Sequence, residues 1–195
     1  MVAVQHERSG RSRIVAAARR LFAEQGFHQT PMSELGVDAG VSIGQIYRHF
    51  KGKNDIILAI VEEDIAQRME KMMEIRDQVR RGEKTIEEGI TLLCLLALAE
   101  EDEALSFEML AEAHRSPVVG TAIEILCQGY RGLIRDLARI AHPPLSEEGL
   151  NAAEELLLAC MFGLGHRSLS APRLSAAATA TQTARMLLSA LRGVT

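Results

Sequence analysis

The chain has 195 residues and a formal net charge of −4 at pH 7, so it is long enough to bury a core and is not basic throughout. It contains no Trp and only 4% aromatic residues, and no alternating β-branched run indicates a sheet, so we expect an all-α protein. The first 55 residues carry a net charge of +3 and the remainder −7. That asymmetry is typical of a DNA-binding segment attached to an acidic body, although solvated surfaces also look like this.

The N-terminal segment is polar. We expect residues 1–10 to be a mobile arm, in which Arg8, together with the nearby Arg11 and Arg13, either follows a phosphate backbone or is solvated. Apolar residues then recur at helical spacing over 12–25, and the glycine that follows ends a predicted first helix.

Residues 30–50 predict two short helices joined by a tight turn. Thr30 is expected to cap the first of them, and Gly40 lies where the chain must reverse. Ser42 with Gln45 three residues later forms a capping box that opens the second helix. This order of elements is that of a helix-turn-helix, whose second helix enters the DNA major groove.

Residue types and spacing over some forty positions are similar to a known signature. The residues that carry the similarity are Arg13, Ile14, Ala17, Ala18, Leu21, Phe22, Gly26, Thr30, Ala39, Gly40, Val41, Ser42, Gly44, Tyr47, His49, Phe50 and Lys53. The pattern resembles the N-terminal signature of the TetR family of one-component bacterial transcription regulators. One departure is Leu35-Gly36, where that family usually carries Ile-Ala. An ordinary helical hairpin with a glycine turn is the alternative interpretation.

The resemblance implies a two-domain organisation. Residues 8–68 are expected to form a TetR-type DNA-binding domain with its helix-turn-helix at about 31–50, and residues 69–195 a ligand-binding and dimerisation domain. The fold class is then all-α, with a three-helix DNA-binding domain joined by a long helix, about 55–81, to a helical body. Five further helices are predicted at about 85–99, 104–114, 117–141, 146–167 and 176–192.

The expected partner is double-stranded operator DNA. Gln45 can read adenine, while Tyr47 and His49 can position the protein on phosphates. The resemblance favours a phosphate contact for Lys53 over a plain surface lysine. The full set expected to contact DNA is Thr30, Ser33, Ser42, Gly44, Gln45, Tyr47, His49 and Lys53.

The family resemblance also implies a homodimer through the last two helices, in which Gly163 and Gly165 allow close helix approach. Completion of a monomer core is the alternative role for these helices. A small, apolar effector is expected to bind the body, although adaptable Met and aromatic side chains are more often plain core. The candidate ligand-binding residues are Phe107, Met109, His114, Cys127, Tyr130, Met161 and Phe162.

Other chemistry finds little support in the sequence. Cys94, Cys127 and Cys160 are expected to be free thiols, with a redox-sensing disulfide as the alternative. Nucleotide-binding and hydrolase motifs and metal-ligand spacings are missing, so we expect no enzyme, no cofactor and no metal site. We also expect no signal peptide and no membrane span, hence a cytoplasmic protein.

Three hypotheses remain open. The first is a DNA-binding regulator, expected to be a ligand-released repressor that binds a palindromic operator as a homodimer. The second is a helical ligand-binding or interaction protein that does not regulate through DNA. The third is a small enzyme with a buried apolar site.

Overall fold

The computed structural model describes residues 2–99 and 103–193, with side chains from residue 10 onward. Nine α-helices and one short 3-10 helix, without a strand, make up this part of the chain, so the all-α prediction is confirmed. The elements are α1 (Val2–Gln25), α2 (Met32–Ala39), α3 (Ile43–His49), α4 (Lys53–Arg80), α5 (Ile86–Leu98), α6 (Glu103–Arg115), α7 (Pro117–Ala141), α8 (Glu147–Gly165), η1 (Arg167–Ser170) and α9 (Ala176–Leu191).

Local capping signals place most of the helix ends. Three glycines adopt positive φ at helix ends or turns, Gly26 at 89°, Gly40 at 62° and Gly82 at 73°, a region that glycine enters without the steric cost of a Cβ. The predicted capping box is present at the start of α3, and Thr85 with Glu88 forms a second one at the start of α5. Ser146 caps α8 by accepting from the backbone N–H of Gly149.

Two helix starts differ from the sequence prediction. α1 begins at Val2, so the backbone of the expected mobile arm is helical, while the side chain of Arg8 lies outside the described part. α2 begins at Met32 with Pro31 at the N-cap position, so the prediction that Thr30 caps this helix was wrong. The Thr30 hydroxyl instead donates to the carbonyl oxygens of Gly26 (3.0 Å) and Leu21 (3.3 Å).

The chain divides into two compact units. Unit 1 comprises Met1–Ile65 and Asp102–Ile125, and unit 2 comprises Ala66–Glu101 and Leu126–Thr195. The first break lies close to the expected boundary between residues 68 and 69. The difference is that α6 and the first part of α7 belong with the helix-turn-helix, because they pack into its core.

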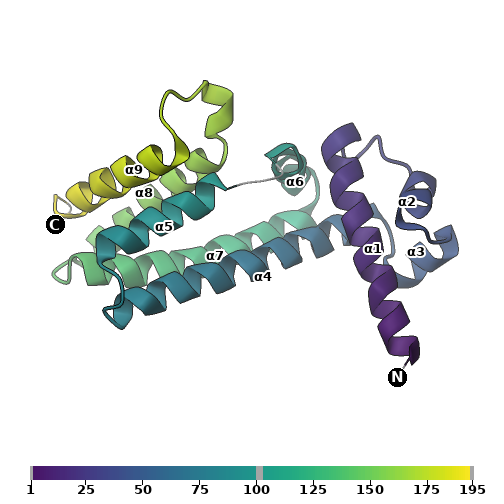
Figure 1. Ribbon diagram of the computed structural model, residues 1–195, viewed down its shortest axis with the longest axis horizontal. Helices are drawn as coiled ribbons and strands as arrows, with labels where there is room; N and C mark the ends of the chain where they lie inside the picture. Colours follow the sequence, from purple (N-terminus) through teal and green to yellow (C-terminus); the bar gives the residue numbers. More distant parts are fainter. Residues whose placement is uncertain (1, 100–102, 194–195) are drawn as a thin grey trace. The chain divides into compact units, whose positions relative to one another are not determined.

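Unit 1 is organised around α1, with α2 and α3 packed against one side of it (Figure 1). Its core contains fully buried side chains from α1 and α4, including Phe22, Ile56 and Ile60. Leu105 of α6 and Val119 of α7 complete the same cluster. Removal of this apolar surface from water contributes roughly 25 cal/mol per Å² to the stability of the unit.

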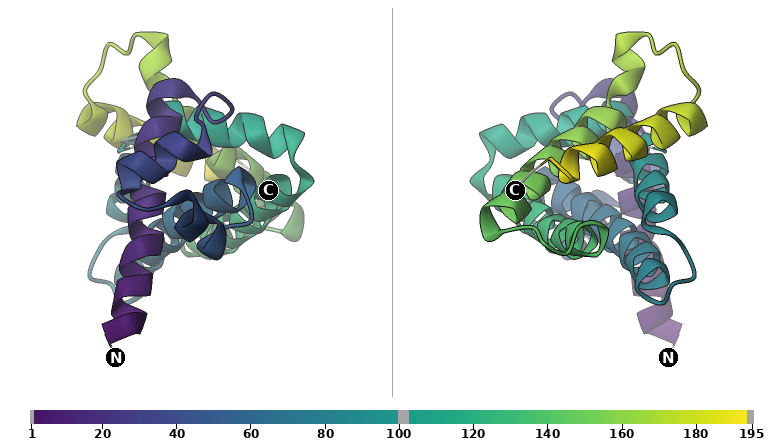
Figure 2. Two further views of the ribbon diagram at one scale, coloured as in Figure 1. Left: turned by 90° about the vertical axis from the view of Figure 1, so that its right-hand side faces the viewer. Right: turned by 90° about the vertical axis from the view of Figure 1, so that its left-hand side faces the viewer.

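Unit 2 is a helical bundle in which α5 packs against both α8 and α9 (Figure 2). Cys94 of α5, Leu157 of α8 and Ala184 of α9 lie in one buried cluster. A second cluster joins Met72 of α4 to Leu137 of α7. Leu93 of α5 lies in this second cluster, so α5 contributes to two cores.

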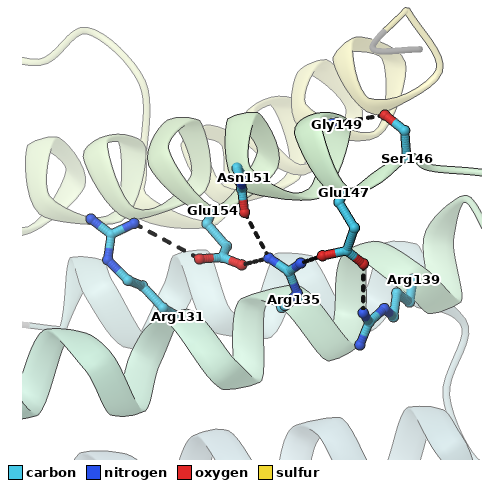
Figure 3. Close-up of polar contacts among 8 residues, drawn as sticks. All are labelled: Arg131, Arg135, Arg139, Ser146, Glu147, Gly149, Asn151 and Glu154. Carbon is cyan, nitrogen blue, oxygen red and sulfur yellow. Dashed lines mark hydrogen bonds and ion pairs between the residues drawn. The ribbon is translucent and has the colours of Figure 1, made fainter.

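Beside the buried apolar contact of Ala138 with Leu150 and Ala153, ion pairs also join α7 to α8 (Figure 3). Arg135 of α7 donates to Glu154 and Glu147 of α8 and, at 3.0 Å, to the side-chain oxygen of Asn151. These contacts raise the pKa of the Arg135 guanidinium, first through the hydrogen bond with Glu154. Arg139 pairs with Glu147 at 3.3 Å. The two arginines are thereby occupied by carboxylates of the neighbouring helix.

Candidate nucleic-acid interface

The turn between α2 and α3 depends on a close backbone approach. The N–H of Val41 donates to the carbonyl oxygen of Gly36 at 2.9 Å. A Cβ on Gly36 would lie 3.0 Å from the carbonyl oxygen of Val41, tighter than normal packing allows. The glycine that departs from the resembled family pattern is therefore accommodated in this chain by a tight turn.

The helix α3 has one buried and one exposed face. Ile46 is fully buried and Phe50, at its C-terminal end, is 4% exposed, so both anchor the helix on the core of unit 1. The other face is open to solvent. It presents Ser42, Ile43, Gly44, Gln45, Tyr47 and Arg48. An exposed helix face with amide, phenolic and basic groups is typical of a helix that enters a major groove.

Gln45 takes part in the capping box with both its backbone and its side chain. Its N–H donates to the Oγ of Ser42 at 3.2 Å, and its Oε1 accepts from the N–H of Ser42 at 2.8 Å. The carboxamide is therefore folded back along the first turn of the helix. A bidentate adenine contact requires the same oxygen as an acceptor, so it competes with this cap.

Lys53 is placed differently from a lysine that points at a phosphate. Its Nζ donates to three backbone carbonyl oxygens, those of Phe27 (2.9 Å), His28 (3.0 Å) and Thr30 (3.0 Å). The ammonium also lies 5.3 Å from the centroid of the Phe27 ring. Since an ammonium has three N–H donors, these bonds use its full capacity. The geometry favours a role in holding the loop between α1 and α2.

The remaining predicted DNA residues divide between surface and interior. Thr30 is fully buried, so its side chain is not presented to a duplex. Ser33 is exposed on the first turn of α2. His49 is half-buried, and its Nε2 lies 3.4 Å from the position that a Cβ on Gly10 would take. Ser33 is thus accessible for its predicted contact, whereas the Thr30 hydroxyl is bonded within unit 1.

Sequence reasoning missed two exposed cations near α3. Arg48 is exposed on the helix, and Lys51 is exposed directly after it. Both are basic residues close to Tyr47 in the sequence, and this could have made them candidates for phosphate contacts. Arg11 is less available, because it pairs with Glu63 (3.3 Å) and lies over the Phe50 ring.

Carboxylates of α6 hold the same loop that Lys53 supports. The N–H of Phe27 donates to Oε2 of Glu108 at 2.9 Å. One turn later, Oε2 of Glu112 lies 3.1 Å from Nε2 of His28, and Glu112 is only 4% exposed. These contacts tie α6 to the helix-turn-helix within unit 1. No local sequence pattern identifies them, since the partners are some eighty residues apart in the chain.

The predicted effector residues are divided between the two units. Those on α6 belong to unit 1, where Met109 packs against the core and Phe107 is 40% exposed. Those on α7 and α8 belong to unit 2, where Tyr130 and Met161 pack against one buried cluster and Phe162 is 56% exposed. The three on α6 are Phe107, Met109 and His114, and the four in unit 2 are Cys127, Tyr130, Met161 and Phe162.

The described part of the chain offers neither a metal-binding cluster nor a membrane-spanning helix. Among its side chains, no group of three or more His, Cys, Asp or Glu is arranged to hold a metal ion. Among its helices, none combines the length and the apolar character that crossing a bilayer requires.

Known proteins share the sequence of the helix-turn-helix region. Residues 14–60 match the model of a family described as bacterial regulatory proteins, tetR family. The fatty acid metabolism regulator protein of Bacillus subtilis is 39% identical over 72 residues, 36% of this chain and 37% of that protein. The HTH-type transcriptional regulator UidR of Escherichia coli K12 is 30% identical over 114 residues, 58% of this chain and 57% of UidR. The matches thus span between about a third and three fifths of these relatives.

Solved structures share the fold over nearly the whole chain. The regulator FadR of Bacillus subtilis, crystallised with stearoyl-CoA, superposes with a TM-score of 0.75 and 20% identity, covering 91% of this chain and 97% of FadR. GusR of Salmonella enterica superposes with a TM-score of 0.71 and 26% identity, covering 92% of this chain and 95% of GusR.

Proposed function

We propose that this chain, which carries the DNA-binding helices of the TetR family of bacterial regulatory proteins, is a sequence-specific transcriptional regulator that represses from a palindromic operator. The observation that carries the proposal is the exposed face of α3. This helix is capped at its start, its opposite face is buried, and it lies inside the region that matches the family model. In this role α3 enters the major groove, and Ser33, Tyr47, Arg48 and Lys51 position it on phosphates.

A homodimer is the second part of the proposal. A single helix-turn-helix contacts few base pairs, and two copies about one DNA turn apart read a palindrome. The outer faces of α8 and α9 supply an apolar surface for a second copy, since Leu156 is 50%, Phe162 56% and Met186 72% exposed. No atom of the described chain lies within 4 Å of a Cβ built on Gly163, so this position is open to a partner helix.

Release by an apolar effector is the third part. Unit 2 offers the half-buried Tyr130 and Met161 beside apolar clusters, and flexible Met side chains adapt to apolar ligands. FadR of Bacillus subtilis, which has this fold, was crystallised with stearoyl-CoA. Stearoyl-CoA is therefore the first probe, with coenzyme A alone as its control. An effector releases DNA only if it binds the DNA-free state more tightly.

Selection from random duplexes tests the function. The full chain is incubated with a library of random double-stranded DNA at about 150 mM salt, where screening weakens non-specific binding. Enrichment of one palindrome, bound by a dimer in sedimentation, is the expected result. A folded chain that enriches no sequence would refute the proposal and bring the interaction-protein hypothesis forward.

A further inference from the structure

The face of α3 that enters the groove carries an apolar group where a regulator needs base contacts. Ile43 is the first residue of the helix and is 45% exposed. One turn later Tyr47 is 55% exposed, and residues four apart lie on the same face of a helix. An isolated exposed Ile is unremarkable on a protein surface. Here it occupies the N-terminal end of the helix, from which base edges are contacted.

The side chain of Ile43 lies beside α2. Its Cγ1 is 3.9 Å from the position that a Cβ on Gly36 would take. A β-branched residue has few χ1 rotamers in a helix, which restricts it further. The side chain therefore presents its methyl groups outward without a large entropic cost on binding.

Gln45, the polar residue two positions after Ile43, is restrained. The carboxamide of Gln45 is folded back by the capping box, with Oε1 2.8 Å from the N–H of Ser42. Gly44, between them, has no side chain. The first turn of α3 thus offers a large apolar contact and only a restrained amide.

From this arrangement we propose that Ile43 reads the C5-methyl group of a thymine in each operator half-site. Thymine is the only DNA base with an apolar group in the major groove, and apolar side chains recognise it by contact. The inference rests on the proposed function and adds a base identity to it. It also predicts that the specificity of the chain depends more on Ile43 than on Gln45.

Deoxyuridine is the probe, because it differs from thymidine only in lacking the C5-methyl group. Each thymine of the duplex selected by the wild-type chain is replaced singly, and affinity is measured at constant salt. One position per half-site should lose about fourfold in affinity, the effect of one methyl-sized group removed from water. In Ile43→Ala the thymine and deoxyuridine duplexes should bind equally well.

The matched control is Ile125→Ala, which makes the same change at a 63% exposed position on α7, outside the helix-turn-helix. It should keep the full discrimination. Ile43→Val, which keeps a branched side chain, should retain part of it, and Tyr47→Phe, which keeps the ring, should retain all of it. Full discrimination in Ile43→Ala, or no sensitive thymine in the wild-type chain, would overturn the inference while leaving the proposed function intact. Failure to select any palindrome would overturn both.

Discussion

The ammonium of Lys53, at the first residue of α4, lies 2.9 Å from the carbonyl oxygen of Phe27, in the loop between α1 and α2. It also donates hydrogen bonds to two further carbonyl oxygens of that loop, those of His28 and Thr30. In the sequence the lysine has the position of a phosphate contact. In the structure it joins the helix that follows the helix-turn-helix to the loop that precedes it, and so holds α2 in place.

Replacement of Lys53 by Met should lower the free energy of unfolding by about 1 to 3 kcal/mol, because it leaves three backbone carbonyls, two of them in partly buried contacts, without their charged donor. Chemical denaturation measures this. Lys51→Met is the control, since the Lys51 side chain is exposed, and its stability should change by less than about 0.5 kcal/mol. Unchanged stability in Lys53→Met, with DNA binding that becomes less sensitive to salt, would restore the phosphate-contact role.

Replacement of Thr30 by Val keeps the shape of the side chain and removes the hydroxyl that donates to Gly26 and Leu21. Because Thr30 is fully buried, the loss should destabilise the chain by about 1 to 2 kcal/mol. Ser33→Ala, at an exposed position, should leave stability unchanged and weaken binding to all duplexes alike. Thermal unfolding and affinity measurements on the two variants separate the roles. A fully stable Thr30→Val would show that the buried hydroxyl contributes nothing.

Two glycines in helices should respond oppositely to the same change. A Cβ on Gly89 of α5 would lie 2.5 Å from Cγ2 of the buried Val79, so Gly89→Ala should destabilise the chain by about 1 to 3 kcal/mol through overpacking. On α7, the described chain leaves the space around a Cβ on Gly132 open. Gly132→Ala should therefore gain up to about 1 kcal/mol of helix propensity. Equal effects in denaturation experiments would contradict the packing of α5 on α4.

Cys94 should be the slowest of the three thiols to react. It is fully buried, and burial, with a smaller contribution from Cys160, raises the pKa of its thiol to about 11. The thiol of the native chain thus stays protonated at pH 8, whereas in the unfolded chain its pKa has the ordinary value of 9.0. Stability from this group is complete below pH 9 and is lost as the pH rises towards 11. Alkylation rates at pH 8 and denaturation of the wild type and Cys94→Ala between pH 8 and 11 test this. Rapid alkylation of native Cys94 would contradict it.

The sequence predicts features that local chemistry determines. The capping signal at Ser42 and the glycine at position 40 correctly predicted the start of α3 and the turn before it, because each involves groups within a few residues. In the structure, burial of Ile46 and Phe50, four residues apart, leaves the opposite face of α3 exposed.

The roles of Lys53 and Thr30 could not be predicted in the same way. Their partners are backbone carbonyls that tertiary folding brings near. Every residue has such a carbonyl, so the residue types in the sequence do not show which ones will be bonded. Glu108 and Glu112 were missed for the same reason, since α6 meets the loop at Phe27 and His28 only in the folded chain. The effector residues were chosen by type alone, and the structure distributes them over two units.

In the proposed function, α3 recognises a specific DNA sequence. The most direct test is the ratio of two dissociation constants at about 150 mM salt, for the selected palindrome and for a shuffled duplex of equal length and composition. We predict that the palindrome binds at least about 1,000-fold more tightly, as specific sites do relative to non-specific DNA. A ratio close to one, from a folded dimer, would contradict the claim, because phosphate contacts alone would then account for all binding.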